Sequence, residues 1–185
     1  MNHLATSKED ILAASRELIK ENGWTAVSIR AVASRCSVSA GTIYNYYESK
    51  ADLLGDTIES IWREIFFNPE DEQAFNDVAA CISWIYKRME YGNEQFPGFF
   101  SLHSLGFMKD EKMDGKKKML QTCGHILNGL CDILKNDPKI RPDVFDEQFT
   151  EKQFADILFS LILVSMIRQD YNPSSILMLI NKTLY

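Results

Sequence analysis

Several side chains able to form hydrogen bonds gather in one short stretch of the sequence, together with an ammonium group: Ser39, Thr42, Tyr44, Asn45, Tyr46 and Lys50. Groups of these kinds contact the phosphates and base edges of nucleic acids. The sequence contains no Ser/His/Asp set in a recognisable context, no glycine-rich phosphate loop and no HExxH motif. The chemistry that this stretch predicts is therefore binding, without enzyme activity.

The residues around this stretch predict two short helices joined by a tight turn. Ser28 is the expected N-cap of the first helix, whose apolar stripe has the spacing i, i+3, i+4, i+7: Ile29, Val32, Ala33 and Cys36. A second N-cap follows closely at Ser39, and the second helix is expected from Ala40 to about Tyr47. This arrangement is typical of a helix-turn-helix, whose second helix reads the major groove of DNA.

Two helix N-termini in this region could bind an anion. The first, Ala40-Gly41-Thr42, has no bulky side chain, so its backbone N–H groups could come close to another surface. The second is expected at Ser49, with Asp52 at the third position of a capping box. Lys50 in that first turn opposes the helix dipole, a cost that binding of a DNA phosphate would explain.

The stretch resembles the DNA-binding domain of the tetracycline-repressor (TetR/AcrR) family of bacterial transcriptional regulators. The resemblance is carried by the runs from Val38 to Tyr47 and from Ser49 to Leu54, and it extends back through Arg30-Ala31-Val32-Ala33 to Ile11-Leu12-Ala13-Ala14 and Leu18-Ile19. The family usually has a small residue, a glycine and a phenylalanine where this chain has Cys36, Ser37 and Tyr47. We expect Ser37 to adopt the turn with some strain.

The resemblance implies a DNA-binding set: Arg30, Ser39, Ala40, Gly41, Thr42, Tyr44, Asn45, Tyr46 and Lys50. It further implies base contacts by Arg30, Ala40, Gly41 and Asn45, and phosphate contacts by Thr42, Tyr44, Tyr46 and Lys50. Packing inside the small N-terminal domain is the alternative for the two tyrosines. The operator sequence is not predicted, because Ala40 and Gly41 offer no bidentate partner for a base.

Charge is distributed unevenly along the 185 residues, which carry a net charge of −6. Residues 1–50 contain six Lys and Arg against five Asp and Glu, so the rest of the chain, with 14 against 21, holds the acidity. We therefore expect DNA contact to be confined to the N-terminal part. The four cysteines show no CxxC spacing, no signal peptide is recognised, and the longest apolar run is too short to span a bilayer. A cytoplasmic protein that holds no metal or cofactor is expected.

Periodicity along the chain predicts an all-α fold in two domains. A capping box at Ser7 begins the first helix and Gly23 ends it, which completes a three-helix domain over residues 1–50. A connecting helix is expected over residues 50–67, and a helical domain for ligand binding and dimerisation over residues 68–185. The helices of this second domain are expected at about 72–89, 99–108, 111–135, 146–169 and 174–185.

Aromatic and sulfur-containing side chains are frequent after position 60 and could line a cavity for a small apolar or aromatic ligand. The candidates are Trp62, Phe66, Trp84, Phe99, Phe100, His103, Phe107, Cys123 and Leu127. For any one of them, packing in the core is the alternative. Cys123 and Cys131 could sense oxidants, or they could be inert buried thiols.

The last two expected helices are apolar nearly all round, and such helices need cover on every side. A second copy of the chain could provide it, in a four-helix interface that the family resemblance also implies. The predicted interface residues are Phe154, Ile157, Leu158, Leu161, Ile162, Ser165, Ile176, Leu177 and Ile180. A homodimer could place two reading helices about 34 Å apart on a pseudo-palindromic operator.

The expected function is that of a DNA-binding transcriptional regulator, a repressor that a small ligand releases from its operator. One alternative is a regulator of the same fold that has no small-molecule inducer, or an activator. Another is a helical enzyme or carrier that has kept the N-terminal domain. The expected partners are double-stranded DNA, a second copy of the chain and the ligand, with no membrane.

Overall fold

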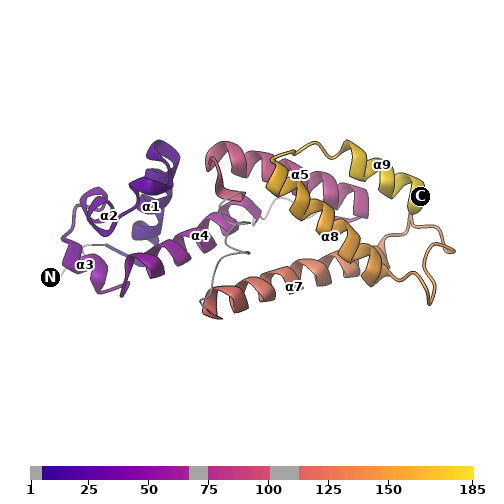
Figure 1. Cartoon of the computed structure of the whole chain (residues 1–185), viewed down its shortest axis with the longest axis horizontal. Coiled ribbons are helices and arrows are strands. Elements are labelled where there is room, and N and C mark those ends of the chain that lie inside the picture. Colours follow the sequence, from indigo (N-terminus) through magenta and orange to yellow (C-terminus); the bar gives the residue numbers. More distant parts are fainter. Residues whose placement is uncertain (1–5, 67–74, 101–112) are drawn as a thin grey trace. The chain divides into compact units, whose positions relative to one another are not determined.

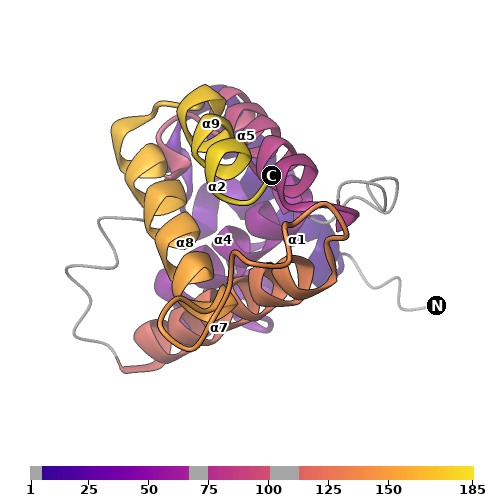
Figure 2. The same ribbon diagram turned by 90° about the vertical axis from the view of Figure 1, so that its right-hand side faces the viewer.

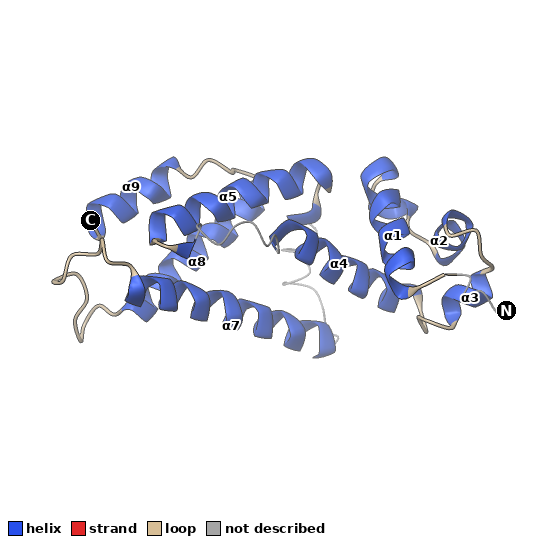
Figure 3. Ribbon diagram, turned by 180° about the vertical axis from the view of Figure 1, so that it is seen from behind, coloured by secondary structure: helices blue, strands red, loops and turns tan. Residues whose placement is uncertain are grey.

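The computed structural model describes residues 6–66, 75–100 and 113–185, with side chains from position 124 onward in the last range. Every regular element in these ranges is a helix, and they contain no strand (Figure 1, Figure 3), so the predicted all-α fold is confirmed. The chain forms two compact units. The first contains the residues up to position 67 together with Glu94–Pro97, and the second contains the remainder.

Short helices make up most of the first unit: α1 (Lys8–Asn22), the 3₁₀ helix η1 (Trp24–Ala26), α2 (Ile29–Arg35), α3 (Ala40–Tyr44) and α4 (Lys50–Phe66). Helix α1 packs against η1, α2 and α4, while α3 packs against α2. Their shared core includes Ile11, Val27, Val32, Ile43 and Leu53, all with no exposed surface.

The ends of α1 are set by the predicted residues. The Ser7 hydroxyl accepts a hydrogen bond from the Asp10 N–H at 3.1 Å, and the Ser7 N–H donates to Asp10 Oδ2 at 2.9 Å. Hydrogen bonds from the Ser7 side chain and backbone also lower the pKa of Asp10. Gly23 ends the helix with a φ of 78°, a conformation that glycine adopts without a Cβ clash.

The second unit contains most of α5 (Val78–Gln95), followed by α7 (Met113–Asn136), α8 (Glu151–Arg168) and α9 (Ser174–Thr183). Figure 2 shows α8 beside α7, and these two helices form the most extensive helix contact of the unit. Core side chains come from several helices: Ile82 and Met89 on α5, Leu158 on α8 and Ile180 on α9 are fully buried.

Two helices of the second unit differ from their expected bounds. The helix expected at 72–89 begins at Val78 and continues through Gly92 to Gln95. The helix expected from position 146 begins at Glu151, because the Asp146 carboxylate accepts the N–H groups of a tight turn instead. A capping box of Thr150 and Gln153 starts this helix. The helix expected at 99–108 lies largely outside the described residues.

The buried carboxylate of Asp137 joins three distant parts of the second unit. Its Oδ2 accepts hydrogen bonds from the Val78 N–H at 2.9 Å and from the Tyr185 hydroxyl at 2.6 Å. Its Oδ1 accepts the Lys139 N–H at 2.9 Å. Val78 opens α5 and Tyr185 follows α9, so one side chain fixes the start of one helix against the end of another.

Replacing this carboxylate should destabilise the second unit. In Asp137→Asn one acceptor oxygen becomes an NH₂ donor, which leaves at least one of the facing donors without a partner in a buried site. We expect the free energy of unfolding, measured by urea denaturation, to fall by about 1–3 kcal/mol. Asp143→Asn changes an exposed aspartate in the same loop and is the control. Equal stability of the two variants would contradict the role given to Asp137.

Candidate nucleic-acid interface

A tight turn between α2 and α3 positions the predicted reading helix. The N–H of Cys36 donates to the Val32 carbonyl at 2.9 Å, and the N–H of Val38 donates to the Ala33 carbonyl at 2.9 Å. Between them Ser37 has a φ of 57°, in the left-handed region that glycine adopts more easily. The strain expected at Ser37 is therefore present, and the turn still closes.

Helix α3 is held by its cap and by one buried side chain. The Ser39 hydroxyl accepts the Thr42 N–H at 3.2 Å and lies 3.0 Å from the Thr42 hydroxyl. Ile43 is fully buried. The helix ends at Tyr44, three residues before the expected end. The opposite side of α3 therefore faces solvent, with Gly41 and Asn45 exposed there.

The fold itself does not require a glycine at position 41. A Cβ at Gly41 would meet only the Ser39 hydroxyl oxygen, at the ordinary contact distance of 3.5 Å. The backbone conformation is helical, so a side chain would be tolerated within the unit. The small surface at this point instead leaves room for another molecule to approach the helix N-terminus closely.

Charge pairing singles out Arg30 and Lys50. Five other cations of the first unit form ion pairs: Lys8 with Asp56, Arg16 and Lys20 with Glu64, Arg35 with Glu17 and Glu21, and Arg63 with Glu59. Within the described residues, the two exposed cations Arg30 and Lys50 have no carboxylate within ion-pair distance. They are thus available to an external anion. Lys50 lies in the first turn of α4, beside the Ser49 hydroxyl that accepts the Asp52 N–H.

The two tyrosines of the predicted set differ in environment. Tyr44 is 56% exposed. The alternative interpretation, that Tyr44 packs inside the N-terminal domain, therefore does not apply to it. The Tyr46 hydroxyl donates instead to the Thr6 carbonyl at 2.7 Å and so ties the end of α3 to the segment before α1. Forty positions separate these residues, and no local pattern could have revealed the contact.

The predicted ligand residues are distributed over both units. Trp62 and Phe66 stack on each other in α4, with ring centroids 5.1 Å apart. In the second unit Phe99 and Phe100 are buried core residues, and Trp84 packs edge-on against Phe75. Leu127 lines a groove between α7 and α8. His103, Phe107 and the side chain of Cys123 lie outside the described residues.

The predicted dimer residues separate into two groups. Five are buried inside the protomer's own unit and cannot touch a second copy as placed: Phe154, Leu158, Ile162, Ile176 and Ile180. Ser165 is bonded to the Tyr86 hydroxyl at 2.7 Å, and Leu177 is half-buried. Ile157 and Leu161 are exposed, and they continue along α8 with Val164 and Ile167. The exposed apolar stripe therefore lies on the opposite side of α8 from the predicted buried residues.

Residues 11–57, which include α2, α3 and the start of α4, match the family model "Bacterial regulatory proteins, tetR family". This N-terminal part of the chain is thus similar to the DNA-binding domain of the tetR family. The curated relatives that it matches are named as HTH-type transcriptional regulators or repressors, the class that the sequence predicted. The HTH-type transcriptional repressor KstR of Rhodococcus jostii is 45% identical over 86 residues, which cover 45% of this chain and 41% of KstR. The chain spans about half, or less, of the curated relatives that it matches.

Solved structures of transcriptional regulators have the same fold along nearly the whole chain. A putative TetR-family regulator from Rhodococcus sp. superposes with a TM-score of 0.64 at 14% identity, covering 96% of this chain and 98% of the other. The regulator FadR from Bacillus subtilis, in complex with stearoyl-CoA, gives 0.61 at 20% identity, with 97% and 100% covered. In the described part of this chain no helix is sufficiently long and apolar to cross a bilayer, and no cluster of side chains there could hold a metal ion.

Tyr47→Phe should stabilise the N-terminal unit. The Tyr47 side chain is 3% exposed, and its buried hydroxyl has no hydrogen-bond partner. Removing an unpaired buried hydroxyl should raise the free energy of unfolding by about 1 kcal/mol. Burial, together with Asp56 and Glu9, raises the pKa of Tyr47 to about 12. Since an unfolded tyrosine ionises near pH 10, the wild type should lose stability between about pH 10 and 12, and the variant should lose less.

The matched control is Tyr44→Phe, which removes an exposed hydroxyl from the same helix-turn-helix. Chemical denaturation at pH 7 and pH 11 measures both effects. If the Tyr47→Phe variant is less stable than wild type at pH 7, the Tyr47 hydroxyl has a stabilising partner and the prediction is wrong.

Proposed function

We propose that the protein is a transcriptional repressor that binds a pseudo-palindromic DNA operator as a homodimer. The main support is the charge pattern of the first unit, where the cations around α3 are selectively unpaired. Arg30 on α2 and Lys50 on α4 flank the reading helix in sequence, and the cations elsewhere in the unit are neutralised by carboxylates. A phosphate backbone would supply the missing anions.

The predicted base and phosphate contacts fit this surface with one change. Arg30, Gly41 and Asn45 are exposed and can approach base edges, and Tyr44 and Lys50 can reach phosphates. Tyr46 is better assigned a positioning role, because its hydroxyl holds the end of α3 to Thr6. The relative KstR is named as a transcriptional repressor, which supports repression rather than activation.

Dimerisation is proposed through the exposed stripe of α8, formed by Ile157, Leu161, Val164 and Ile167, and through Met178 and Leu179 on α9. The α8 positions follow the spacing of one helix face, so they form a continuous apolar line. A two-fold axis that crosses this line places the stripe of one protomer against the same stripe of the other. Two copies would present two reading helices to successive major grooves.

Release by an apolar ligand remains the proposal for regulation. Its support is the resemblance in fold to FadR of Bacillus subtilis, whose structure contains stearoyl-CoA, and the aromatic side chains of the second unit. A ligand acts in this way when it binds better to the arrangement of the dimer that does not fit DNA. An operator complex that long-chain acyl-CoA does not affect would favour a regulator without this class of inducer.

Lys50→Ala should weaken operator binding and reduce its dependence on salt. The operator is first selected from random double-stranded DNA with the full-length protein. Each lost phosphate contact lowers the slope of log K against log salt by nearly one, so the dimer should lose about 2. Arg63→Ala, which removes an exposed cation paired with Glu59, should leave the slope unchanged. Equal slopes for Lys50→Ala and wild type would show that Lys50 does not bind a phosphate. Failure to select any DNA sequence would contradict the proposed function.

Leu161→Asp should dissociate the dimer. Leu161 lies in the middle of the α8 stripe and is exposed in the protomer, so the substitution should spare the fold. Loss of two buried leucines and burial of two charges should raise the dimer dissociation constant at least about 100-fold. Sedimentation velocity measures this, with Asn128→Asp on exposed α7 as a control of equal charge change. A Leu161→Asp variant that remains dimeric would exclude this face.

A further inference from the structure

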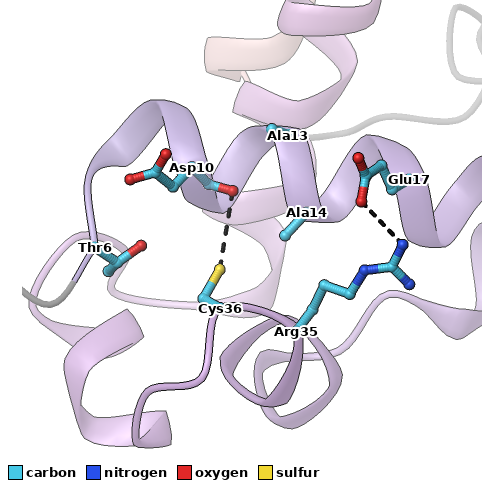
Figure 4. A pocket seen from close by; sticks show the side chains of 7 residues that line it. All are labelled: Thr6, Asp10, Ala13, Ala14, Glu17, Arg35 and Cys36. Carbon is cyan, nitrogen blue, oxygen red and sulfur yellow. Dashed lines mark hydrogen bonds and ion pairs between the residues drawn. The ribbon is translucent and has the colours of Figure 1, made fainter.

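A solvent-open cavity of about 310 Å³ lies at the surface of the first unit, between α1 and the end of α2. Figure 4 shows its lining: Ala13 and Ala14 provide short walls on α1, and Cys36 stands opposite them at the end of α2. The cavity is large enough for a small organic molecule. None of its lining residues belongs to the predicted DNA-binding or ligand-binding sets, so the site has no role in the function proposed above.

The Thr6 hydroxyl is a buried polar group without a hydrogen-bond partner at this cavity. Thr6 is 7% exposed, and its Oγ1 atom makes no hydrogen bond with any described residue. Its backbone is fixed, because the Thr6 carbonyl accepts the Tyr46 hydroxyl at 2.7 Å. Figure 4 shows the hydroxyl oxygen turned toward the space between Asp10 and Cys36. A buried hydroxyl without a partner is costly, and a polar atom of a bound molecule would satisfy it.

The Cys36 thiol lies beside this hydroxyl and is partly open to solvent. Its Sγ atom makes a weak contact with the Asp10 carbonyl oxygen, at 3.8 Å. Burial raises the pKa of Cys36, the neighbouring Thr6 hydroxyl opposes that rise, and the Asp10 carboxylate adds to it. The thiol is therefore mostly protonated at neutral pH, and its reaction with an electrophile should accelerate as the pH increases.

Charges around the cavity restrict the kind of reagent that can enter. Asp10 and Glu17 carry carboxylates at the two ends of the lining. The Arg35 guanidinium is engaged by Glu17 at 2.9 Å and by Glu21 at 2.6 Å, so it offers no free positive charge. Anionic reagents such as glutathione disulfide are disfavoured by charge and by size. Small neutral molecules are favoured.

We propose that Cys36 is a modification site for small, neutral electrophiles with a carbonyl-conjugated double bond, and that the adduct weakens DNA binding. The sulfur attacks the β-carbon and forms a C–S bond, while the electron pair of the C=C bond moves to the carbonyl oxygen as an enolate. The Thr6 hydroxyl donates a hydrogen bond to that oxygen. The thiol proton passes to water, and water returns a proton to the α-carbon. The step is an addition, with no leaving group and no oxidant.

An adduct at this position would act on the turn that orients α3. Cys36 is the C-cap residue that follows α2, and the Cys36 and Val38 N–H groups close the turn onto α2 carbonyls. Extra atoms between α1 and the end of α2 would press on this packed corner, which cannot adapt freely. This regulatory consequence rests on the proposed DNA-binding function, whereas the reactivity of Cys36 does not.

The reactivity is tested with N-ethylmaleimide on the full-length protein, by following each cysteine through peptide mass spectrometry. Burial raises the pKa of both Cys36 and Cys131, so their acidity does not favour Cys36. We expect Cys36 to react at least about tenfold faster than Cys131, because the Thr6 hydroxyl is placed to bind the carbonyl oxygen of the reagent. Thr6→Val should slow the Cys36 reaction about tenfold and leave Cys131 unchanged, and Thr6→Ser should restore the rate. Unfolding curves confirm that each variant is folded. A Cys36 rate no higher than that of Cys131, or one insensitive to Thr6→Val, would overturn the site.

The regulatory consequence is tested on the selected operator. Alkylated wild type should bind at least about tenfold more weakly than untreated protein, while Cys36→Ser should bind before and after treatment alike. Rapid alkylation of Cys36 with unchanged affinity would overturn the regulatory half of the proposal. If untreated protein bound no DNA sequence, the proposed function would fail, and the alkylation rates would still decide whether the Cys36 site exists.

Discussion

The tight turn between α2 and α3 is the constraint on which the first unit depends. Successive N–H groups of Cys36, Ser37 and Val38 donate back to carbonyls of α2 and hold Ser37 at positive φ. A non-glycine residue in that conformation costs about 1–2 kcal/mol, so packing on both sides must maintain it. Helix α3 has five residues and would not be stable alone. Its orientation follows from this turn, from the Ser39 cap and from the burial of Ile43.

The ion pairs of the first unit contribute little to stability. Their main effect is to determine which positive charges stay unpaired on its surface. Pairs such as Lys8–Asp56 and Arg63–Glu59 are partly or largely exposed, and exposed pairs contribute about 0–1 kcal/mol each. Each of them, however, removes one positive charge from the surface that DNA could use. The two cations left unpaired among the described residues of the first unit, Arg30 and Lys50, lie just before and just after the turn and α3. A nearly neutral domain can thus present a local positive surface.

Local signals in the sequence predicted the helix starts well, because a cap involves residues only three positions apart. Ser7, Ser28 and Ser39 all accept the expected backbone N–H groups. Long-range contacts were not predictable in this way. The sequence could not distinguish the exposed Tyr44 from Tyr46, whose partner is forty positions away. It also gave no sign of the ion pairs between α1 and α4, which depend on how two helices pack.

Helix α8 shows why composition alone could not assign its faces. Apolar residues occur all round this helix. The sequence therefore predicted that the helix is buried, but it did not show which faces are covered by the protomer and which by a second copy. One side, with Phe154 and Leu158, is covered by the protomer itself. The other side leaves Ile167 53% exposed, in line with Leu161 and other apolar side chains. Each such side chain left in water forgoes about 25 cal/mol per Å² of buried apolar surface. A stripe of this kind that runs along one helix face is self-complementary about a two-fold axis, so a second copy is the simplest cover that the chain itself can supply.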